Sequence, residues 1–259
     1  MNNINLADLH STVIETMYLG PHLELIECHE DIHTYFSEPK YASANYLGFK
    51  LKEIDHETNV VDQTCSLLSQ NKINFSWICE DIREKKTATL IKSRGFDKSF
   101  SFWSMFHCKH DFIPTPIKNV FVEEVEIELL KKYTKDLATQ LNVPPAYVQQ
   151  PLRQSDYAKS QKLKAYAAFN PKGQILGFAL LIEMAETCSA LMRIAVVFPE
   201  FRKSGVYREL VRTRLLDAYK CGMKFVITHA YESSSNYLET LYMKKFKRFT
   251  AYTNSFAID

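Results

Sequence analysis

The chain contains 259 residues, of which 46% are hydrophobic and 13% are aromatic. A chain of this length and composition can fill one large core or two of ordinary size. Its net charge of +2 gives no indication of nucleic acid or an anionic membrane as a partner, and its seven glycines argue against a glycine-rich dinucleotide-binding fold.

The cysteine pattern and the length of the apolar runs indicate the compartment in which the protein is expected to occur. The six cysteines are scattered and include no C-x-x-C pair, a pattern typical of free thiols in a reducing compartment. His107, Cys108 and His110 could offer metal ligands, but ligands on one short segment rarely converge on an ion, so we expect no metal. The amino end lacks a signal-peptide pattern, and no apolar run reaches the ~18 residues of a membrane span. We therefore expect a soluble, cytoplasmic protein.

The first part of the chain alternates between helical and extended patterns. Helices are predicted for residues 6–19, 59–70 and 84–93. Strands are predicted for residues 23–28, 73–79 and 96–108. Residues 46–54 fit either a half-buried strand or the start of a helix.

Residues 111–119 are predicted to form a linker. Pro114 and Pro116 make this segment stiff and extended. We therefore expect one domain at residues 1–110 and a second at residues 120–259.

The second part of the chain repeats the mixture of helices and strands. Helices are predicted for residues 126–141, for a segment from 144 to about 159, and for residues 206–221 and 236–244. Strands are predicted for residues 120–125, 164–170, 174–184, 190–197, 224–230 and 249–258.

The polar turn after residues 190–197 is the feature around which the second part is organised. Pro199 ends the strand because proline offers no N–H to a ladder. Free N–H groups at the start of the next helix favour a phosphate, and Gly205 permits close approach of the backbone. Arg202 and Lys203 add positive charge. Taken alone, the pattern also fits a strand–turn–helix unit that binds nothing.

This turn carries a family resemblance. The run Val197-x-Pro199-x-Phe201-Arg202-x-x-Gly205-Val206 resembles the acyl-CoA loop of the GNAT superfamily of N-acyltransferases, V-x-P-x-[YF]-R-x-x-G-[IV]-[GA]. Tyr207 departs from that pattern, because the family has Gly or Ala there, and a tyrosine would crowd the pyrophosphate. Residues 241–246 resemble the closing block L-Y-x-K-x-G-F, without its glycine. The resemblance covers about residues 119–259.

An internal repeat extends the resemblance to the first part of the chain. Residues 75–102 are similar to residues 225–252, with Phe96 aligned to Phe246, and both segments end in strand, helix and strand. No R-x-x-G turn precedes the first copy. We interpret residues 1–110 as a degenerate GNAT-like copy that has lost the cofactor loop; chance similarity of two α/β halves is the alternative.

The resemblance implies an α/β (α+β) fold of two tandem GNAT-like domains, each a mixed, mostly antiparallel sheet flanked by helices. It implies acetyl-CoA as a co-substrate and no metal. The expected contacts to the cofactor are the strand residues Ile194, Ala195, Val196 and Val197 and the turn residues Arg202, Lys203, Ser204, Gly205, Val206 and Tyr207. The N–H groups of residues 195–197 would stabilise the thioester oxygen. Asn236 either contacts the pantetheine arm or belongs to the cap of the last helix.

Two residues are candidates for proton transfer. Tyr242 matches the family tyrosine that protonates the leaving thiolate, and a phenol keeps its proton at neutral pH. Packing is the alternative role for this tyrosine. His229, near the end of a strand, is a candidate base because an imidazole titrates near neutral pH. Glu183, Glu232 and water are its rivals.

We therefore expect an acyl-CoA-dependent N-acetyltransferase in which a primary amine attacks the thioester directly within a ternary complex. The alternative is a non-catalytic acyl-CoA-binding or protein-interaction module with the same fold. The basic run at residues 244–248 fits a solvated face or a site for the cofactor's 3′-phosphate better than nucleic acid. The acceptor amine, the acyl chain length and the oligomeric state stay open.

Overall fold

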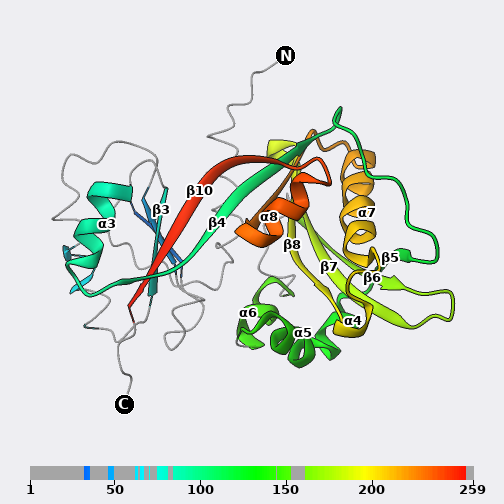
Figure 1. The fold of residues 1–259 in the computed structure, drawn as a ribbon, viewed down its shortest axis with the longest axis horizontal. Helices are drawn as coiled ribbons and strands as arrows, with labels where there is room; N and C mark the ends of the chain where they lie inside the picture. The colour runs from blue at the N-terminus through cyan, green and yellow to red at the C-terminus, as the bar shows by residue number, and fades with distance from the viewer. Residues whose placement is uncertain are drawn as a thin grey trace. The chain divides into compact units, whose positions relative to one another are not determined.

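A computed structural model of the protein describes residues 32–35, 46–49, 62–63, 65–66, 70, 75–80, 84–143, 145–152 and 161–254. These residues have a mixed α/β fold in which helices flank β-sheet (Figure 1). They fall into two units: unit 1 lies within Met1–Trp103 and Lys247–Asp259, and unit 2 is within Ser104–Phe246. The helix predicted at residues 6–19 and the strand predicted at residues 23–28 lie outside the described residues.

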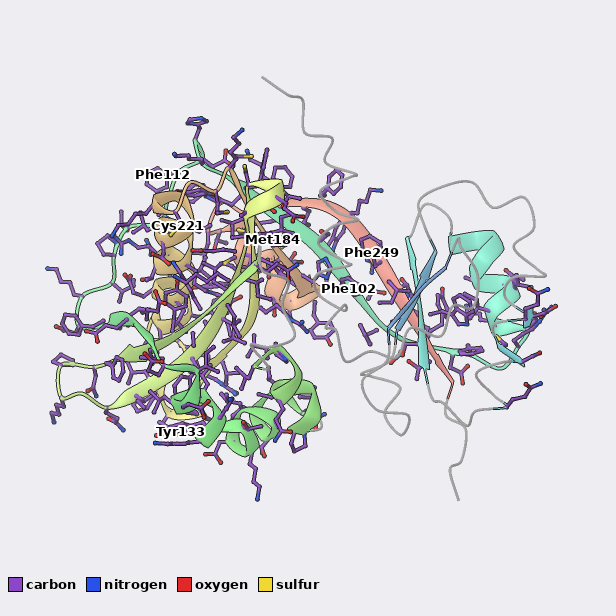
Figure 2. The ribbon with its side chains drawn as sticks, turned by 180° about the vertical axis from the view of Figure 1, so that it is seen from behind. Phe102, Phe112, Tyr133, Met184, Cys221 and Phe249 are labelled. Carbon is purple, nitrogen blue, oxygen red and sulfur yellow. The ribbon has the colours of Figure 1, made fainter. Side chains whose placement is uncertain are left out.

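The strands described in unit 1 are four to twelve residues long, and they are accompanied by helix α3. Its elements are β1 (Ile32–Tyr35), β2 (Tyr46–Phe49), β3 (Phe75–Glu80), α3 (Glu84–Lys92), the first part of β4 (Asp97–Cys108) and the last part of β10 (Lys244–Asn254). For residues 46–54 the sequence left a strand or the start of a helix open. The described residues 46–49 form strand β2. Trp77, Phe96 and Tyr252 are buried in this unit. Phe102 and Phe249 stack with ring centroids 5.4 Å apart (Figure 2).

Each unit contains a strand from the other part of the sequence. In unit 1, residues 249–254 of β10 pair antiparallel with β3. In unit 2, β4 neighbours β9 (Phe225–Tyr231), and the backbone N–H of Lys109 donates to the carbonyl oxygen of Lys224 at 3.1 Å. Residues 111–119 contain no helix or strand and belong to unit 2. The division into domains at 1–110 and 120–259 therefore differs from these units and stays a prediction.

In the sheet of unit 2, the strands that follow β4 are in the order β9-β8-β7-β6-β5. Its strands are β5 (Phe121–Val125), β6 (Gln161–Phe169), β7 (Ile175–Met184) and β8 (Ser189–Val197), followed by β9. Neighbouring strands are antiparallel except β8 and β9, which are parallel. The predicted strands of this region are confirmed, with ends shifted by a few residues.

Helices cover both faces of this sheet. The predicted helix at 126–141 is two helices, α4 (Ile127–Lys132) and α5 (Thr134–Leu141), which meet at Tyr133. The Tyr133 ring packs on Phe178 of β7 at 5.0 Å. Strand side chains alternate between faces, so Leu181 and Glu183 of β7 point to the face opposite Phe178. Helix α7 (Val206–Lys220) lies on that face, because Lys164 joins Glu183 to Asp217 of the helix.

The remaining helical segments are short. They are α6 (Pro145–Gln149), η3 (Gln150–Leu152), η5 (Ala185–Thr187), η6 (Pro199–Phe201) and α8 (Glu232–Glu239). The prediction of the last helix at 236–244 is wrong in position, because the chain leaves the helix at Thr240, takes φ of 67° at Tyr242 and starts β10 at Lys244. Among the described residues, no helix combines the length and the apolar character that a membrane crossing requires.

Candidate functional site

Strands β8 and β9 run side by side only at their start. Their parallel register begins with Ser189 opposite Phe225 and ends with Met192 opposite Thr228. There the Thr228 hydroxyl donates a hydrogen bond to the Met192 carbonyl oxygen at 3.1 Å. Within the described stretch 161–254, no further β8–β9 pair follows. The edge of β8 at residues 193–197 is therefore left without a neighbouring strand on that side.

A bulge in β8 lies where the two strands part. The register with β7 joins Leu180 to Arg193 and Ala179 to Ala195, so Ile194 is the extra residue. Ile194 has φ of 34°, outside the conformations that β-branched residues normally adopt. A bulge re-aims the backbone groups beside it. The predicted cofactor strand, Ile194 to Val197, thus begins at this bulge.

The polar turn follows directly. After η6, the chain reaches Gly205 at φ of 86°, and α7 begins at Val206. Glycine suits this position because the left-handed conformation is costly for residues with a Cβ atom. The first N–H groups of α7 have no partner within the helix, and the helix dipole favours an anion beside them.

A cavity of about 720 Å³ joins the strand to the turn. Most of the residues predicted to hold the cofactor line it: Ala195, Val196, Val197, Arg202, Lys203, Gly205, Val206 and Tyr207. Ile194 and Ser204 are adjacent to lining residues in the chain but do not belong to the lining. With Arg208, the wall carries three cationic side chains, which suits an elongated polyanion.

Sequence reasoning missed the opposite wall of the cavity. It is formed by Ile117, by Gln140 and Leu141 at the end of α5, and by Ser233, Ser234 and Tyr237 of α8. The Tyr237 ring lies 5.7 Å from the ring of Tyr207. Burial raises the pKa of Tyr207, so its hydroxyl keeps its proton at neutral pH. No local pattern in the sequence signals these residues, because only tertiary contacts bring them to the turn.

The segment predicted as a linker packs against the turn. The backbone N–H of Ile117 donates to Oε2 of Glu209 at 2.9 Å, and Nη2 of Arg208 donates to Oγ1 of Thr115 at 2.6 Å. A Cβ atom placed on Gly205 would come within 3.1 Å of the Ile117 side chain. Ile117 thus forms part of the cavity wall, and Thr115 is tied to Arg208 beside it.

Arg202 reaches back over the cavity from the turn. Its Nε donates to the carbonyl oxygen of Val197 at 3.3 Å, and its Nη2 donates to Oε1 of Gln140 at 2.9 Å. The guanidinium therefore links the end of β8 to α5, and a ligand that follows β8 toward the turn would meet it.

The structure does not bring Tyr242 to this cavity. Tyr242 is 47% exposed, and its ring lies 4.7 Å from Phe112 beside a separate cavity of about 440 Å³. His229 lies on β9 one residue beyond the last pair with β8, outside the cavity lining. Asn236 lies inside α8, and its Oδ1 accepts a hydrogen bond from Lys245 at 2.7 Å. Its alternative role in a helix cap is wrong, because α8 already begins at Glu232.

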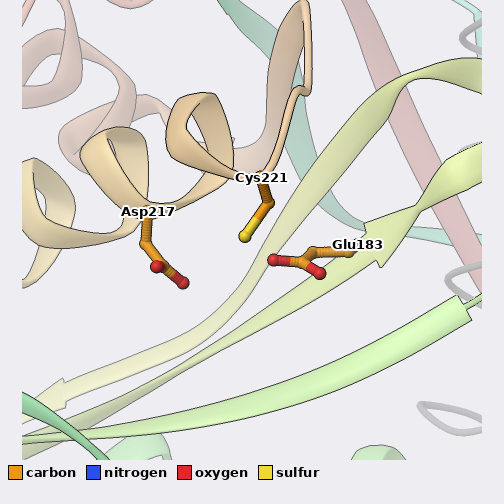
Figure 3. Close-up of side chains that lie close together, drawn as sticks. All are labelled: Glu183, Asp217 and Cys221. Carbon is orange, nitrogen blue, oxygen red and sulfur yellow. The ribbon is translucent and has the colours of Figure 1, made fainter.

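A second cluster of polar side chains lies at the far end of α7. Glu183 of β7, Asp217 and Cys221 converge there, close enough to be considered as metal ligands (Figure 3). The ammonium group of Lys164 lies among them, 2.6 Å from Asp217, 2.7 Å from Glu183 and 3.3 Å from the Cys221 sulfur. A lysine thus supplies the positive charge that a metal would bring. Glu183, a rival candidate for the base, thus forms an ion pair with Lys164.

The pKa values of this cluster follow from its pairing. Burial opposes the charge of Asp217, but hydrogen bonds from Lys164 and from the Tyr166 hydroxyl outweigh it and hold the pKa of Asp217 below its usual value. Burial likewise opposes the charge of Lys164, and its carboxylate partners raise its pKa above the usual range. Both groups stay charged at neutral pH, so the cluster is a stable ion network.

Comparison with known proteins places this architecture among the GNAT acetyltransferase folds. A GCN5-related N-acetyltransferase from Kribbella flavida superposes with a TM-score of 0.74 at 8% identity, covering 97% of this chain and 96% of the other. A GCN5-related N-acetyltransferase from Sphaerobacter thermophilus gives 0.65 at 13% identity over 86% and 76%. A tandem GNAT protein from the clavulanic acid biosynthesis pathway gives 0.59 at 12% identity over 81% and 74%. No family model and no curated protein matches the sequence. The chain has the GNAT fold.

Proposed function

We propose that the protein is an acyl-CoA-dependent N-acyltransferase that moves an acetyl group from acetyl-CoA to a primary amine. The observation that carries the proposal is the parting of β8 from β9 after Met192 and Thr228, at the head of a cavity that ends in a cationic helix start. Backbone groups of a strand edge suit the amides of the pantetheine arm. The turn at 202–207 suits a pyrophosphate.

The bulge supports the chemical part of the proposal. Attack of an amine on a thioester places negative charge on the carbonyl oxygen, and fixed N–H donors stabilise that charge. The backbone at Ala195 to Val197 lines the cavity and is the proposed source of the donor. The amine adds to the carbonyl carbon and gives up a proton to a base, the carbon–sulfur bond breaks, and the CoA thiolate leaves and takes up a proton.

The proton donor is proposed from the phenols near the cavity. Tyr242 is the residue predicted by the motif, and Tyr237 is one of the two tyrosines, with Tyr207, that line the cavity. Parallel Tyr242→Phe and Tyr237→Phe variants distinguish them: loss of turnover with unchanged acetyl-CoA affinity identifies the donor. His229 remains the proposed base, and a normal pH–rate profile for His229→Ala would remove it from this role.

Calorimetric titration with acetyl-CoA tests the proposal first. We expect micromolar binding to the parent protein and its loss in an Arg202→Ala, Gly205→Glu double variant, because that variant removes one charge and adds a carboxylate at the helix start. The matched control is Lys172→Ala, Gly173→Glu. It makes the same two changes at an exposed hairpin turn whose glycine also has a positive φ, of 75°. Equal loss in both double variants, or no binding to the parent, would contradict the proposal.

A non-catalytic acyl-CoA-binding module is the second candidate function. It is favoured by the position of Tyr242 outside the cavity and by the side chains of Tyr207 and Ile117 within it. Release of free CoA thiol in the presence of an amine panel separates the two functions. Binding without thiol release from any amine would favour the module.

A further inference from the structure

Arg214 is a buried cation that no motif explains. It lies on α7, two turns beyond the start of the helix, and only 2% of its surface is exposed. Among the described residues it forms no ion pair, and its hydrogen bonds go to backbone carbonyl oxygens. Burial lowers the pKa of Arg214 to about 10, which leaves the guanidinium charged at neutral pH.

Two of these carbonyls belong to the two sides of the β8 bulge. Nη1 of Arg214 donates to the carbonyl oxygen of Leu180 at 3.0 Å and to that of Arg193 at 3.4 Å. Leu180 and Arg193 are the pair that immediately precedes Ile194 in the β7–β8 register. One guanidinium nitrogen therefore joins both strands at the base of the bulge, while Nε is anchored to the helix through the Leu210 carbonyl oxygen at 3.0 Å.

A buried guanidinium without a carboxylate is unfavourable for stability, because its desolvation is not offset by an opposite charge. An apolar side chain of similar length would fill the same space, but it would leave the carbonyls at the bulge without these donors. We therefore interpret these hydrogen bonds as fixing the backbone conformation of β8 at the bulge. That conformation sets the direction of the backbone after Ile194, where Ala195 to Val197 line the cavity.

We infer that Arg214 is a positioning residue for the acyl group: it holds the β8 bulge so that the backbone N–H groups after Ile194 meet the thioester carbonyl of a bound acyl-CoA. The inference rests on the proposed function and adds a residue that touches neither cofactor nor acceptor. The same helix begins at the phosphate turn and carries Arg214. One rigid element therefore fixes the distance between the phosphate end and the carbonyl end of the cofactor.

Binding and spectroscopy test the inference without an identified acceptor. The probes are CoA and acetyl-CoA labelled with ¹³C at the carbonyl carbon, and the readouts are the two Kd values and the carbonyl chemical shift of the bound probe. In Arg214→Met we expect CoA to bind as in the parent. The preference for acetyl-CoA over CoA should fall about three- to tenfold, the range of one net hydrogen bond. The carbonyl resonance should return toward its position in water.

Two further variants separate positioning from packing. Arg214→Lys keeps a charged donor and should recover part of the carbonyl shift. Leu215→Ala removes a buried side chain from the neighbouring position of the same helix and should leave the shift in place. If Arg214→Met does not fold, Arg214→Lys is measured together with hydrogen exchange of the peptide 193–197, which should be faster than in the parent.

The outcomes are distinct. A parent protein that binds neither probe overturns the proposed function and this inference with it. A parent that binds both, with an unchanged carbonyl shift in Arg214→Met, overturns the inference and leaves the proposed function intact. Equal loss of the shift in Leu215→Ala, or unchanged exchange at 193–197 in Arg214→Lys, would show a packing role and overturn the inference as well.

Discussion

Lys164 and Arg214 are both buried cations between the sheet of unit 2 and α7, yet they have opposite kinds of partner. Lys164 pairs with the carboxylates of Glu183 and Asp217. Arg214 binds the carbonyl oxygens of Leu180, Arg193 and Leu210. The comparison indicates two uses of buried charge. At Lys164 it attaches the end of a helix to the sheet, and at Arg214 it fixes the course of a strand beside the cavity.

The largest expected effect is on stability at the carboxylate cluster. Lys164→Ala leaves two carboxylates close together without their cation, and the free energy of unfolding should fall by about 3–5 kcal/mol. Lys164→Met, which fills the space but also lacks the charge, should lose nearly as much. Urea denaturation measures both. A loss below about 1 kcal/mol would mean that the cluster relaxes into water and that the contrast with Arg214 is wrong.

The second prediction concerns a variant that strains β8 two residues beyond the bulge, at Val196, without changing any charge. A Cβ atom on Gly177 of β7 would collide with the carbonyl oxygen of Val196, so Gly177→Ala should force β7 and β8 apart. We expect a loss of about 1–3 kcal/mol in unfolding free energy and weaker binding of acetyl-CoA. Gly173→Ala is the control for binding: its surroundings are open, and the strain from its φ of 75° lowers stability without a collision between strands. Weakened binding in the control as well would rule out a specific effect on β8.

The third prediction is that the stability contributed by the Lys164 cluster depends on pH, whereas that contributed by Arg214 does not. The pKa of Asp217 in the folded protein lies below its unfolded value of about 3.9, so its pairing stabilises the fold above that pH. This contribution disappears as the pH falls through the folded-state pKa. The pKa of Lys164 is raised, so its contribution persists beyond the unfolded value of about 10.4.

Urea titrations from pH 2 to pH 7 measure the acid side of this dependence. The parent should lose stability below about pH 4, and Asp217→Asn should show a shallower decline. Arg214→Lys should keep the parent slope, because Arg214 has no carboxylate partner among the described residues. An unchanged slope in Asp217→Asn would contradict the assignment.

The smallest effect is expected at Cys221. The residue is exposed, and its thiol accepts a hydrogen bond from the Lys164 ammonium at 3.3 Å. Partial desolvation of the sulfur and the neighbouring Glu183 raise the pKa of the thiol, so it is neutral. Cys221→Ala should change the unfolding free energy by less than about 0.5 kcal/mol. A change as large as that of Lys164→Ala would make the thiol a full member of the ion network.

Sequence patterns predicted what is local in this molecule. The strands of unit 2, α7 and the turn at 202–205 all follow from apolar periodicity, proline and glycine placement. The predicted position of the last helix was wrong because Ser234, Ser235 and Asn236 resemble a cap, whereas α8 already starts at Glu232. Its end is set by the backbone at Tyr242, which no propensity indicates.

The parts of the site that were not predicted depend on contacts between distant segments. Ile117 reaches the turn through Glu209, and Tyr237 reaches it through the placement of α8. Lys164 and Arg214 are ordinary charged residues by sequence, and only the folded chain buries them. The motif predicted the turn at residues 202–207. The other cavity wall, with Ile117 and Tyr237, and the contact of Arg214 with β8 depend on tertiary packing.

The exchange of β4 and β10 between the units has a consequence for biosynthesis. When β3 leaves the ribosome, its β10 partner at residues 249–254 is not yet made, so one edge of β3 lacks its ladder until about 170 further residues have been synthesised. Open strand edges pair readily with other chains, and long-range pairing is slow. The nascent protein is therefore exposed to aggregation at the edge of β3 until residues 249–254 are released from the ribosome.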